Sequence, residues 1–392
     1  MLTGGGTGGH LVPFAPVIEA LRTRFLIQRD KLPAKIDPQE LEICFAGVAD
    51  KATCDFFKSY DVPVIAITSG KWRRYADLRN FFDMVFRLPL GVTKALFVIW
   101  RIMPDVIISK GGYGSVPVVL ASIVYRIPVL LHESDAVMGV ANRFLSRFAT
   151  TIAVGFSDAR EGSIKNTKKT FVTGIPVRLG FGAVDQASSK RHFGFSDDEQ
   201  VILVVGGSQG AQQINELLLH HLAFFVAEAG IIHVTGQENF KAVSTVAQEL
   251  ITNSPRRTQY KPFPYLQDDM EIALAAADVV VSRAGATTLA ELARCRKAAI
   301  IIPLLGSAGN HQLMNAQVFE KAGAVLVLET SSTSGKELFK HNVQTLLADE
   351  GLRKRLQDNI GKLDTPQAGE QIADLAIRLG TGFAAAYETG LN

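Results

Sequence analysis

The chain has 392 residues, of which 47% are hydrophobic and 20% charged, and its net charge is +3. This length exceeds one ordinary hydrophobic core, so we expect a globular protein of two domains, and the charge is too small to indicate nucleic acid as a partner. The three cysteines form no CxxC pair, which argues against a zinc or redox centre. The first residues are mostly glycine rather than a basic and then apolar segment, so no signal peptide is expected.

Short apolar runs alternate with helical patterns along the whole chain. The runs are continuous rather than alternating with polar residues, which is typical of strands buried on both faces of a parallel sheet. The fold class is therefore α/β with parallel sheets. The predicted strands are residues 41–47, 62–68, 105–109, 128–133, 150–156 and 169–174, then 200–208, 230–236, 278–282, 298–304 and 324–329.

A glycine-rich turn occurs twice, at residues 4–9 and again at residues 206–210 after a strong strand. A second start of this kind indicates a second doubly wound, Rossmann-like domain. We expect an N-terminal domain over residues 1–178, a polar linker over 179–199, a C-terminal domain over 200–365 and a helix over 366–392. Ligands of such folds bind at the carboxyl ends of the strands, which predicts a site in the cleft between the two sheets.

The opening run TGGGTGGH (residues 3–10) contains the pattern G-x-G-x-x-G, which alone is a weak signal. Glycines let the backbone approach a ligand closely, and the helix that follows presents free N–H groups to an anion. A tight turn with only a packing role is the alternative. A dinucleotide site has a full strand before the turn, whereas only residues 1–3 precede this one. His10 ends the run and is a helix cap, a surface residue or a catalytic group.

Three stretches of the second half carry polar groups after a predicted strand. The turn around Ser208 leads from strand to helix, which favours an anion site over an ordinary strand-to-helix turn. In ADVVVSRAGATTLAEL (277–292), Glu291 falls in about the first helical turn, where a carboxylate accepts ribose hydroxyls or favours the helix dipole. The loop near residue 310 carries Asn310, His311, Gln312 and Asn315, which suit sugar hydroxyls or a capped helix start.

These stretches, together with GGYGSVP (111–117), HESDAVMGVANRFLSRFA (132–149), TGIPVR (173–178) and IADLAIRLG (372–380), resemble the MurG family of N-acetylglucosaminyltransferases along essentially the whole chain. The resemblance implies the two-domain GT-B fold, with the C-terminal helix crossing back to the N-terminal domain. It implies inverting transfer of GlcNAc from UDP-GlcNAc to the C4 hydroxyl of MurNAc-pentapeptide carried on undecaprenyl diphosphate, a step of peptidoglycan synthesis. Neither a cofactor nor a metal is expected. Asp135 and Ile175 stand where the family usually has asparagine.

The same resemblance implies roles for individual residues. His10 is the candidate general base, since an imidazole suits proton removal near neutral pH. Residues implied for the acceptor diphosphate are Gly6, Gly111, Gly112, Tyr113 and Gly114. Residues implied for the donor are Thr7, Gly8, Gly9, Asp135, Arg178, Ser208, Gln209, Gly210, Met270, Ala286, Thr287, Glu291, His311 and Gln312.

An acceptor with a polyprenyl chain implies contact with a membrane, and residues 71–104 mix basic, aromatic and apolar side chains. Lys94, Phe97, Trp100 and Arg101 have the composition of an interfacial helix on an anionic membrane surface. A core helix with solvated charges is the alternative. We expect a peripheral protein on the cytoplasmic face of the bacterial inner membrane, with cell-wall synthesis proteins as possible partners.

Other functions remain open on the sequence. A GT-B glycosyltransferase with a diacylglycerol acceptor would use a different lipid. A UDP-GlcNAc 2-epimerase would turn over the sugar nucleotide without an acceptor. A dinucleotide-dependent oxidoreductase is disfavoured by the short first strand and by the second glycine turn. A non-catalytic sugar-nucleotide binder is a further alternative if His10 is not a base.

Overall fold

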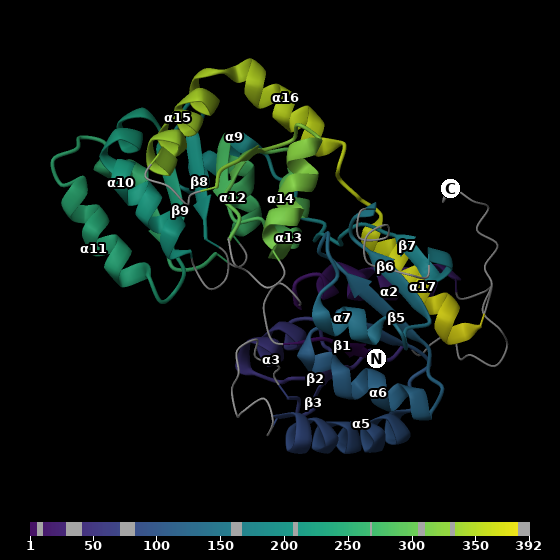
Figure 1. The fold of residues 1–392 in the computed structure, drawn as a ribbon. Helices are drawn as coiled ribbons and strands as arrows, with labels where there is room; N and C mark the ends of the chain where they lie inside the picture. The colour runs from purple at the N-terminus through teal and green to yellow at the C-terminus, as the bar shows by residue number, and fades with distance from the viewer. Residues whose placement is uncertain are drawn as a thin grey trace. The chain divides into compact units, whose positions relative to one another are not determined.

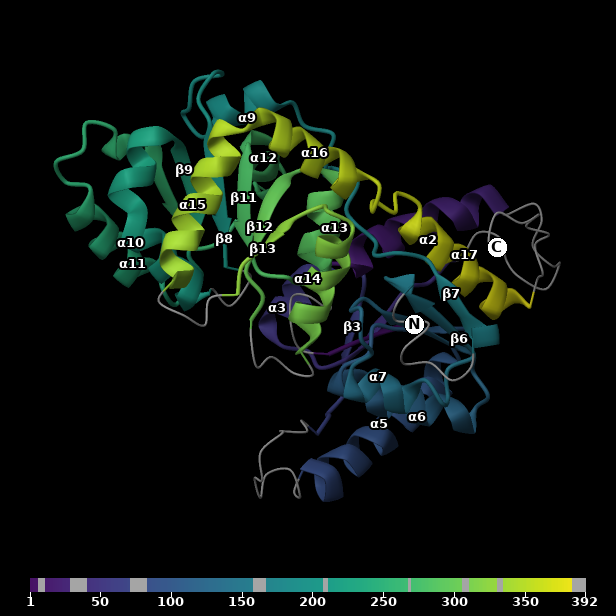
Figure 2. The ribbon, with the colours of Figure 1, turned by 45° about the horizontal axis from the view of Figure 1, so that its top comes forward.

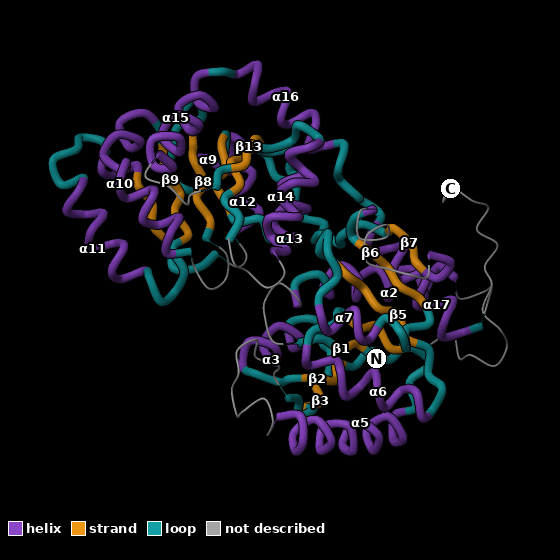
Figure 3. Tube along the Cα trace, in the orientation of Figure 1, coloured by secondary structure: helices purple, strands orange, loops and turns teal. Residues whose placement is uncertain are grey.

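The computed structural model describes residues 1–5, 11–28, 41–70, 83–157, 167–206, 211–266, 269–304, 310–329 and 334–382. The chain forms two compact units, unit 1 (Met1–Pro176 with Pro366–Asn392) and unit 2 (Val177–Thr365). Figures 1 and 2 show the ribbon from two directions, and Figure 3 distinguishes helices, strands and loops. Each unit has its own parallel sheet with helices packed on it, which confirms the predicted fold class.

The sheet of unit 1 has the strand order β3-β2-β1-β4-β5-β6-β7. Its strands are β1 (Leu2–Thr3), β2 (Phe45–Gly47), β3 (Val64–Ala66), β4 (Ile107–Ser109), β5 (Val129–Glu133), β6 (Thr151–Val154) and β7 (Thr170–Val172). The chain moves outward from β1 to β3 and then returns to place β4 on the other side of β1, where Thr3 pairs with Ser109. This reversal between β1 and β4 is the topological switch point, where doubly wound sheets bind ligands.

The helices of unit 1 cover both faces of its sheet (Figure 1). They are α2 (Phe14–Gln28), α3 (Lys51–Lys58), α5 (Leu88–Ile102) after the π-helix η2 (Asp83–Arg87), α6 (Val116–Val124) after the 3-10 turn η3 (Tyr113–Ser115), α7 (Val140–Leu145), the 3-10 turn η4 (Thr167–Lys169) and α17 (Ala368–Thr381). One sheet face, with Ile107 and Leu131, packs against α5, α6 and α7. The other face, with Ile108 and Leu130, packs against α2, α3 and α17.

The last helix belongs to unit 1, which confirms the predicted return of the C-terminal helix. α17 packs beside α2, and Arg24 of α2 forms ion pairs with Asp374 at 3.0 Å and Glu370 at 3.2 Å. Ile372 and Ala376 of α17 are buried, as their helical spacing predicts.

The sheet of unit 2 has the order β10-β9-β8-β11-β12-β13 and repeats the reversal of unit 1. Its strands are β8 (Val201–Val205), β9 (Gly230–Val234), β10 (Tyr260–Phe263), β11 (Val279–Ser282), β12 (Ala298–Ile301) and β13 (Leu326–Val327). β8 (VILVV) and β11 (VVVS) are mostly β-branched and almost wholly buried, as expected for central strands. Val205 pairs with Ser282 at the carboxyl end, so the second switch point lies between β8 and β11.

The helices of unit 2 complete its core (Figure 2). They are α9 (Gln186–His192), α10 (Gln212–Glu228), α11 (Phe240–Leu250), the 3-10 turn η5 (Arg257–Gln259), α12 (Met270–Ala276), α13 (Ala286–Arg294), α14 (His311–Lys321), α15 (Ser334–Ala348) and α16 (Glu350–Gly361). Phe225 of α10 and Phe339 of α15 are fully buried with ring centroids 5.7 Å apart. Burying each such side chain stabilises the fold by roughly 2 to 3 kcal/mol.

Two expectations differ from the structure. β10 has no counterpart among the predicted strands, because Lys261 and Pro262 interrupt the apolar pattern. Proline is tolerated there because β10 is the edge strand of its sheet. The segment 179–199, expected as a linker, lies within unit 2 and contains α9, which begins where Asp185 accepts the amide of Ser188 at 2.8 Å.

No helix within the described ranges is both long enough and apolar enough to span a bilayer. The uncharged stretch at residues 112–125 forms η3 and α6, in agreement with the prediction of a glycine turn followed by a buried helix.

Candidate active site

Two glycine turns meet at the switch point of unit 1. The chain leaves β1 through Gly4 and Gly5, and it leaves β4 through residues 111–114. A Cβ on Gly5 would lie 2.7 Å from the amide nitrogen of Gly114, and a Cβ on Gly114 would lie 2.6 Å from the carbonyl oxygen of Gly4. Gly111 and Gly112 have φ of +76° and +75°, which favours glycine. Bare backbone therefore lines this edge of the sheet.

The predicted acceptor-diphosphate residues that the structure describes are Gly111, Gly112, Tyr113 and Gly114, and they form one turn. Tyr113 opens η3, and its carbonyl accepts the hydroxyl of Ser69 at 2.5 Å. The remaining predicted residues of the opening run, Gly6, Thr7, Gly8, Gly9 and His10, lie outside the described ranges.

A buried carboxylate organises the loop after β5. Glu133 accepts the amides of Asp135 and Gly139, each at 3.0 Å, and the side-chain amide of Asn142 at 2.9 Å. Burial raises the pKa of Glu133, as does the charge of Asp135, while the hydrogen bonds act in the opposite direction. Asp135, implied as a donor contact, thus sits half-buried on a loop folded around this carboxylate.

A buried lysine lies beside this loop. The ammonium of Lys110 is 2.8 Å from Nδ1 of His132. Burial lowers the pKa of Lys110 to about 8, against the charges of Glu133 and Asp135, which raise it. No role was predicted for Lys110, which directly precedes the motif at residues 111–117, or for Glu133, which lies within the motif at residues 132–149. The available signal was a charged side chain directly at the end of a buried strand.

Arg178 lies at the start of unit 2, held between a carboxylate and an aromatic ring. Its Nε is 3.5 Å from Oε1 of Glu271, and its guanidinium carbon is 5.0 Å from the centroid of Phe181. Gly180 makes room for this pair, because a Cβ there would lie 1.8 Å from Oε2 of Glu271. Nε makes no hydrogen bond within the described part of the chain. A guanidinium fixed in this way suits a phosphate group, which it binds in a planar fork.

The charges of Arg178 and Glu271 act on the carboxyl group of Glu291. The expectation that Glu291 lies in the first helical turn is wrong, because α13 begins at Ala286 and Glu291 is its sixth residue. At that position the helix dipole has little effect. Burial raises the pKa of Glu291 to about 7, while the charge of Arg178 lowers it and that of Glu271 raises it. Ala286 and Thr287, predicted as donor contacts, form the first turn of the same helix.

Arg283, for which no role was predicted, directly follows β11 and anchors the carboxyl end of this strand. Arg283 donates from Nη1 to Oε1 of Gln213 and to the carbonyl of Ile302, each at 3.1 Å. Oε1 of Gln312 accepts the amide of Leu304 at 2.9 Å.

The remaining predicted donor residues fall in three places. His311 is the first residue of α14, and it is preceded by Asn310, which has φ of +54° and provides no side-chain cap. Met270 is the first residue of α12 and is half-buried. Ser208, Gln209 and Gly210 lie outside the described ranges.

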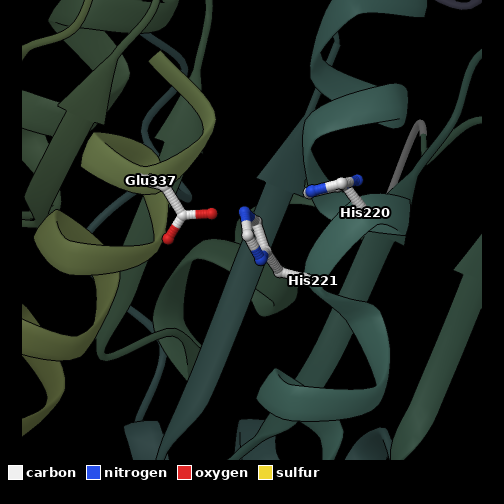
Figure 4. Close-up of side chains that lie close together, drawn as sticks. All are labelled: His220, His221 and Glu337. Atoms are coloured by element: carbon white, nitrogen blue, oxygen red, sulfur yellow. The ribbon is translucent and has the colours of Figure 1, made fainter. Parts of the chain in front are cut away.

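A further cluster of possible metal ligands joins α10 to α15, apart from the strand ends. Within the described ranges, His220, His221 and Glu337 each place one potential ligand atom within 4.8 Å of the others (Figure 4). Nε2 of His221 already donates to the carbonyl of Lys336 at 3.0 Å. Burial lowers the pKa of His221, and so does the charge of Lys340. We therefore assign these side chains to helix packing.

Similarity to known proteins extends along almost the whole chain. Residues 1–154 match the glycosyltransferase family 28 N-terminal domain, and residues 201–368 match the glycosyltransferase family 28 C-terminal domain. The chain belongs to glycosyltransferase family 28. It is therefore a glycosyltransferase. The N-terminal match covers β1 to β6 of the first sheet, and the C-terminal match covers all strands of the second.

Individual family 28 proteins agree with this assignment. A relative from Halothermothrix orenii is 34% identical over 96% of this chain and 97% of its own, and is named UDP-N-acetylglucosamine--N-acetylmuramyl-(pentapeptide) pyrophosphoryl-undecaprenol N-acetylglucosamine transferase. The crystal structure of MurG from Acinetobacter baumannii matches with a TM-score of 0.71 and 26% identity, over 96% of this chain and 98% of that one. The resemblance to the MurG family and the GT-B fold are thereby confirmed.

A UDP-GlcNAc 2-epimerase from Neisseria meningitidis also matches, with a TM-score of 0.66 and 15% identity, over 96% of this chain and 99% of that one. At this identity the likeness shows the shared fold alone.

Proposed function

We propose that this chain transfers GlcNAc from UDP-GlcNAc to the C4 hydroxyl of MurNAc-pentapeptide carried on undecaprenyl diphosphate. The observation that carries the proposal is its likeness, over almost the full length of both chains, to a relative named for this reaction. The position of several predicted ligand segments supports it, since residues 111–114, Asp135, Ala286 with Thr287, and His311 with Gln312 follow strands at or next to the two switch points.

Unit 2 would hold the donor. Arg178 would bind the diphosphate, because Glu271 and Phe181 hold its guanidinium in place. Glu291 would accept the ribose hydroxyls, and Met270 would border the uracil. The N-terminus of α13, with Ala286 and Thr287, would face the sugar or the diphosphate and present free N–H groups to it.

Unit 1 would hold the acceptor. The backbone of residues 111–114, together with the glycines of the opening run, would receive the acceptor diphosphate, since a Cβ on Gly5, Gly111 or Gly114 would clash with neighbouring atoms. Asp135 would contact the transferred sugar from the loop after β5. As a carboxylate in place of the family's asparagine, it accepts hydrogen bonds from sugar hydroxyls and donates none.

The reaction would be a single inverting displacement. The C4 oxygen of the acceptor forms a bond to the anomeric carbon of GlcNAc, and the bond from that carbon to the diphosphate of UDP breaks. His10 would take the hydroxyl proton. The leaving diphosphate gains charge, so Arg178 and the helix N-termini would stabilise the transition state more than the bound donor. We expect neither metal nor cofactor in this step.

The test is UDP release from UDP-GlcNAc with and without a short-chain analogue of the lipid-linked acceptor, for wild type and His10→Ala. We expect acceptor-dependent release that collapses in the variant while donor binding is kept. Release that survives in His10→Ala would move the base elsewhere. Release with diacylglycerol alone would support a different lipid acceptor, and epimerisation of UDP-GlcNAc without an acceptor would overturn the transferase proposal.

We also propose that α5 contacts an anionic membrane surface. Leu90, Phe97 and Trp100 are exposed by 61%, 59% and 61%. At 100° per residue, Leu90, Lys94, Phe97 and Arg101 share one face, opposite the buried Ile99. Exposed aromatic and apolar groups beside basic residues are typical of a helix in the membrane interface.

Sedimentation with phosphatidylglycerol vesicles tests this surface. Phe97→Ser with Trp100→Ser should lower the bound fraction severalfold without changing the thermal unfolding temperature. Val246→Ser with Leu250→Ser removes comparably exposed apolar groups from α11 and is the matched control. Equal binding by wild type and the α5 variant would exclude this helix as the contact.

A further inference from the structure

Lys110 is a buried cation at the carboxyl end of β4, where unit 1 changes direction. Its side chain is 4% exposed, and lysine is almost never buried without partners. The ammonium contacts Nδ1 of His132 at 2.8 Å and also the hydroxyl of Ser134. Both partners come from the neighbouring strand and its loop, so the lysine joins the chain after β4 to the chain after β5.

The His132 arm reaches a third segment. Nε2 of His132 is 3.2 Å from the carbonyl oxygen of Gly174. A carbonyl only accepts, so Nε2 carries the ring hydrogen, and Nδ1 accepts from Lys110. Burial, with the charge of Lys110, holds the pKa of His132 well below its usual range, so the ring is neutral. Gly174, with φ of +80°, belongs to the segment that leads from β7 to Arg178.

The Glu133 arm acts through charge. This carboxylate is 5% exposed, and it accepts two amides of the loop 134–139 and the side chain of Asn142 on α7. A buried carboxylate is costly unless a cation offsets it. Lys110 has the opposite charge and interacts electrostatically with Glu133 and with Asp135. Lys110, which lies outside the loop, therefore offsets part of the negative charge of Glu133 and Asp135.

We propose that Lys110 is a positioning residue. Its single buried ammonium holds the chain segments after β4, β5 and β7 in fixed positions relative to one another. These segments carry residues 111–114, Asp135 and the approach to Arg178. The proposal rests on the proposed function for what these residues bind. Lys110 itself is too buried to touch a substrate.

Lys110→Met tests this role, because methionine keeps the length and removes the charge. We expect about tenfold faster hydrogen exchange at the amides of Asp135 and Gly139 and about tenfold lower kcat/KM for GlcNAc transfer. The control is Lys190→Met. That lysine is 6% exposed and pairs with Asp278 at 3.0 Å in unit 2, so its loss should leave exchange in the 134–139 loop and kcat/KM within twofold.

A double-mutant cycle separates coupling from general damage. Combining Lys110→Met with Glu133→Gln removes both charges. The double variant should therefore fold even if the unpaired charge of Glu133 prevents Lys110→Met alone from folding. If Lys110 acts through Glu133, Lys110→Met lowers kcat/KM less in the Glu133→Gln background than in wild type. The proposal is overturned if the effects of the two substitutions on kcat/KM simply multiply. It is also overturned if hydrogen exchange in the 134–139 loop of the Lys110→Met variant is as slow as in wild type. The exchange readout needs no substrate, so a wild type without transferase activity would refute the proposed function and leave this inference standing.

Discussion

Donor binding should weaken about tenfold between pH 8 and pH 6, because it depends on the charge of Glu291. Burial raises the pKa of this carboxyl to about 7. About nine-tenths of it is then ionised at pH 8 and about one-tenth at pH 6. If only the carboxylate accepts the ribose hydroxyls, the apparent dissociation constant scales inversely with that fraction. UDP-GlcNAc suits the test, since each phosphate of its diphosphate diester keeps one charge throughout this range.

Isothermal titration with UDP-GlcNAc at pH 6, 7 and 8, at constant ionic strength, measures this dependence. Glu291→Gln should bind weakly and equally at all three values. Glu271→Gln provides a second check, because the charge of Glu271 helps to raise the pKa of Glu291. Its removal should move the midpoint to lower pH. A flat wild-type profile, or a pH dependence that persists in Glu291→Gln, would refute the reasoning.

Two further predictions concern stability. His233 is fully buried, and burial lowers its pKa from 6.5 to about 3. Below pH 6.5 the unfolded chain therefore binds a proton that the folded chain does not, and the stability falls as the pH drops toward 3. From pH 7 to pH 5 the loss for unit 2 is about 2 kcal/mol by urea denaturation, and His233→Gln should remove it; an unchanged slope would contradict this. Gly114→Ala would place a methyl group 2.6 Å from the carbonyl oxygen of Gly4, costing about 1 to 3 kcal/mol in thermal denaturation and abolishing transfer. Gly351→Ala in α16 is the control, and equal behaviour of the two variants would disprove the tight contact.

Local patterns were enough to predict most strands and the glycine turn at residues 111–114. β8 and β11 are continuous apolar runs that end at glycine or at a polar residue, and the sheet order puts those ends where ligands were expected. The pattern failed at β10, where Pro262 is acceptable only because the strand lies at an edge. Edge position depends on strand order, which no local window contains.

The buried charges show the same limit more clearly. From the sequence, Lys110 next to a glycine turn is indistinguishable from a solvated residue that binds anions. Its burial depends on His132 and Gly174, which are distant in the chain. The segment 179–199 was expected as a linker because it is polar and contains glycine, whereas Lys190 within it is buried and pairs with Asp278 in unit 2.

Burial also divides the charged groups at the strand ends into two kinds. Arg178 and Glu271 keep 24% and 21% of their side chains exposed, so a ligand can reach them and compete for their contacts. Lys110 and Glu133 are 4% and 5% exposed, and their polar atoms are engaged by protein groups. A substitution in the first pair should therefore change affinity for an anionic ligand and its salt dependence. A substitution in the second pair should change the placement of loops, because an uncompensated buried charge is relieved only by protonation or by movement of the chain.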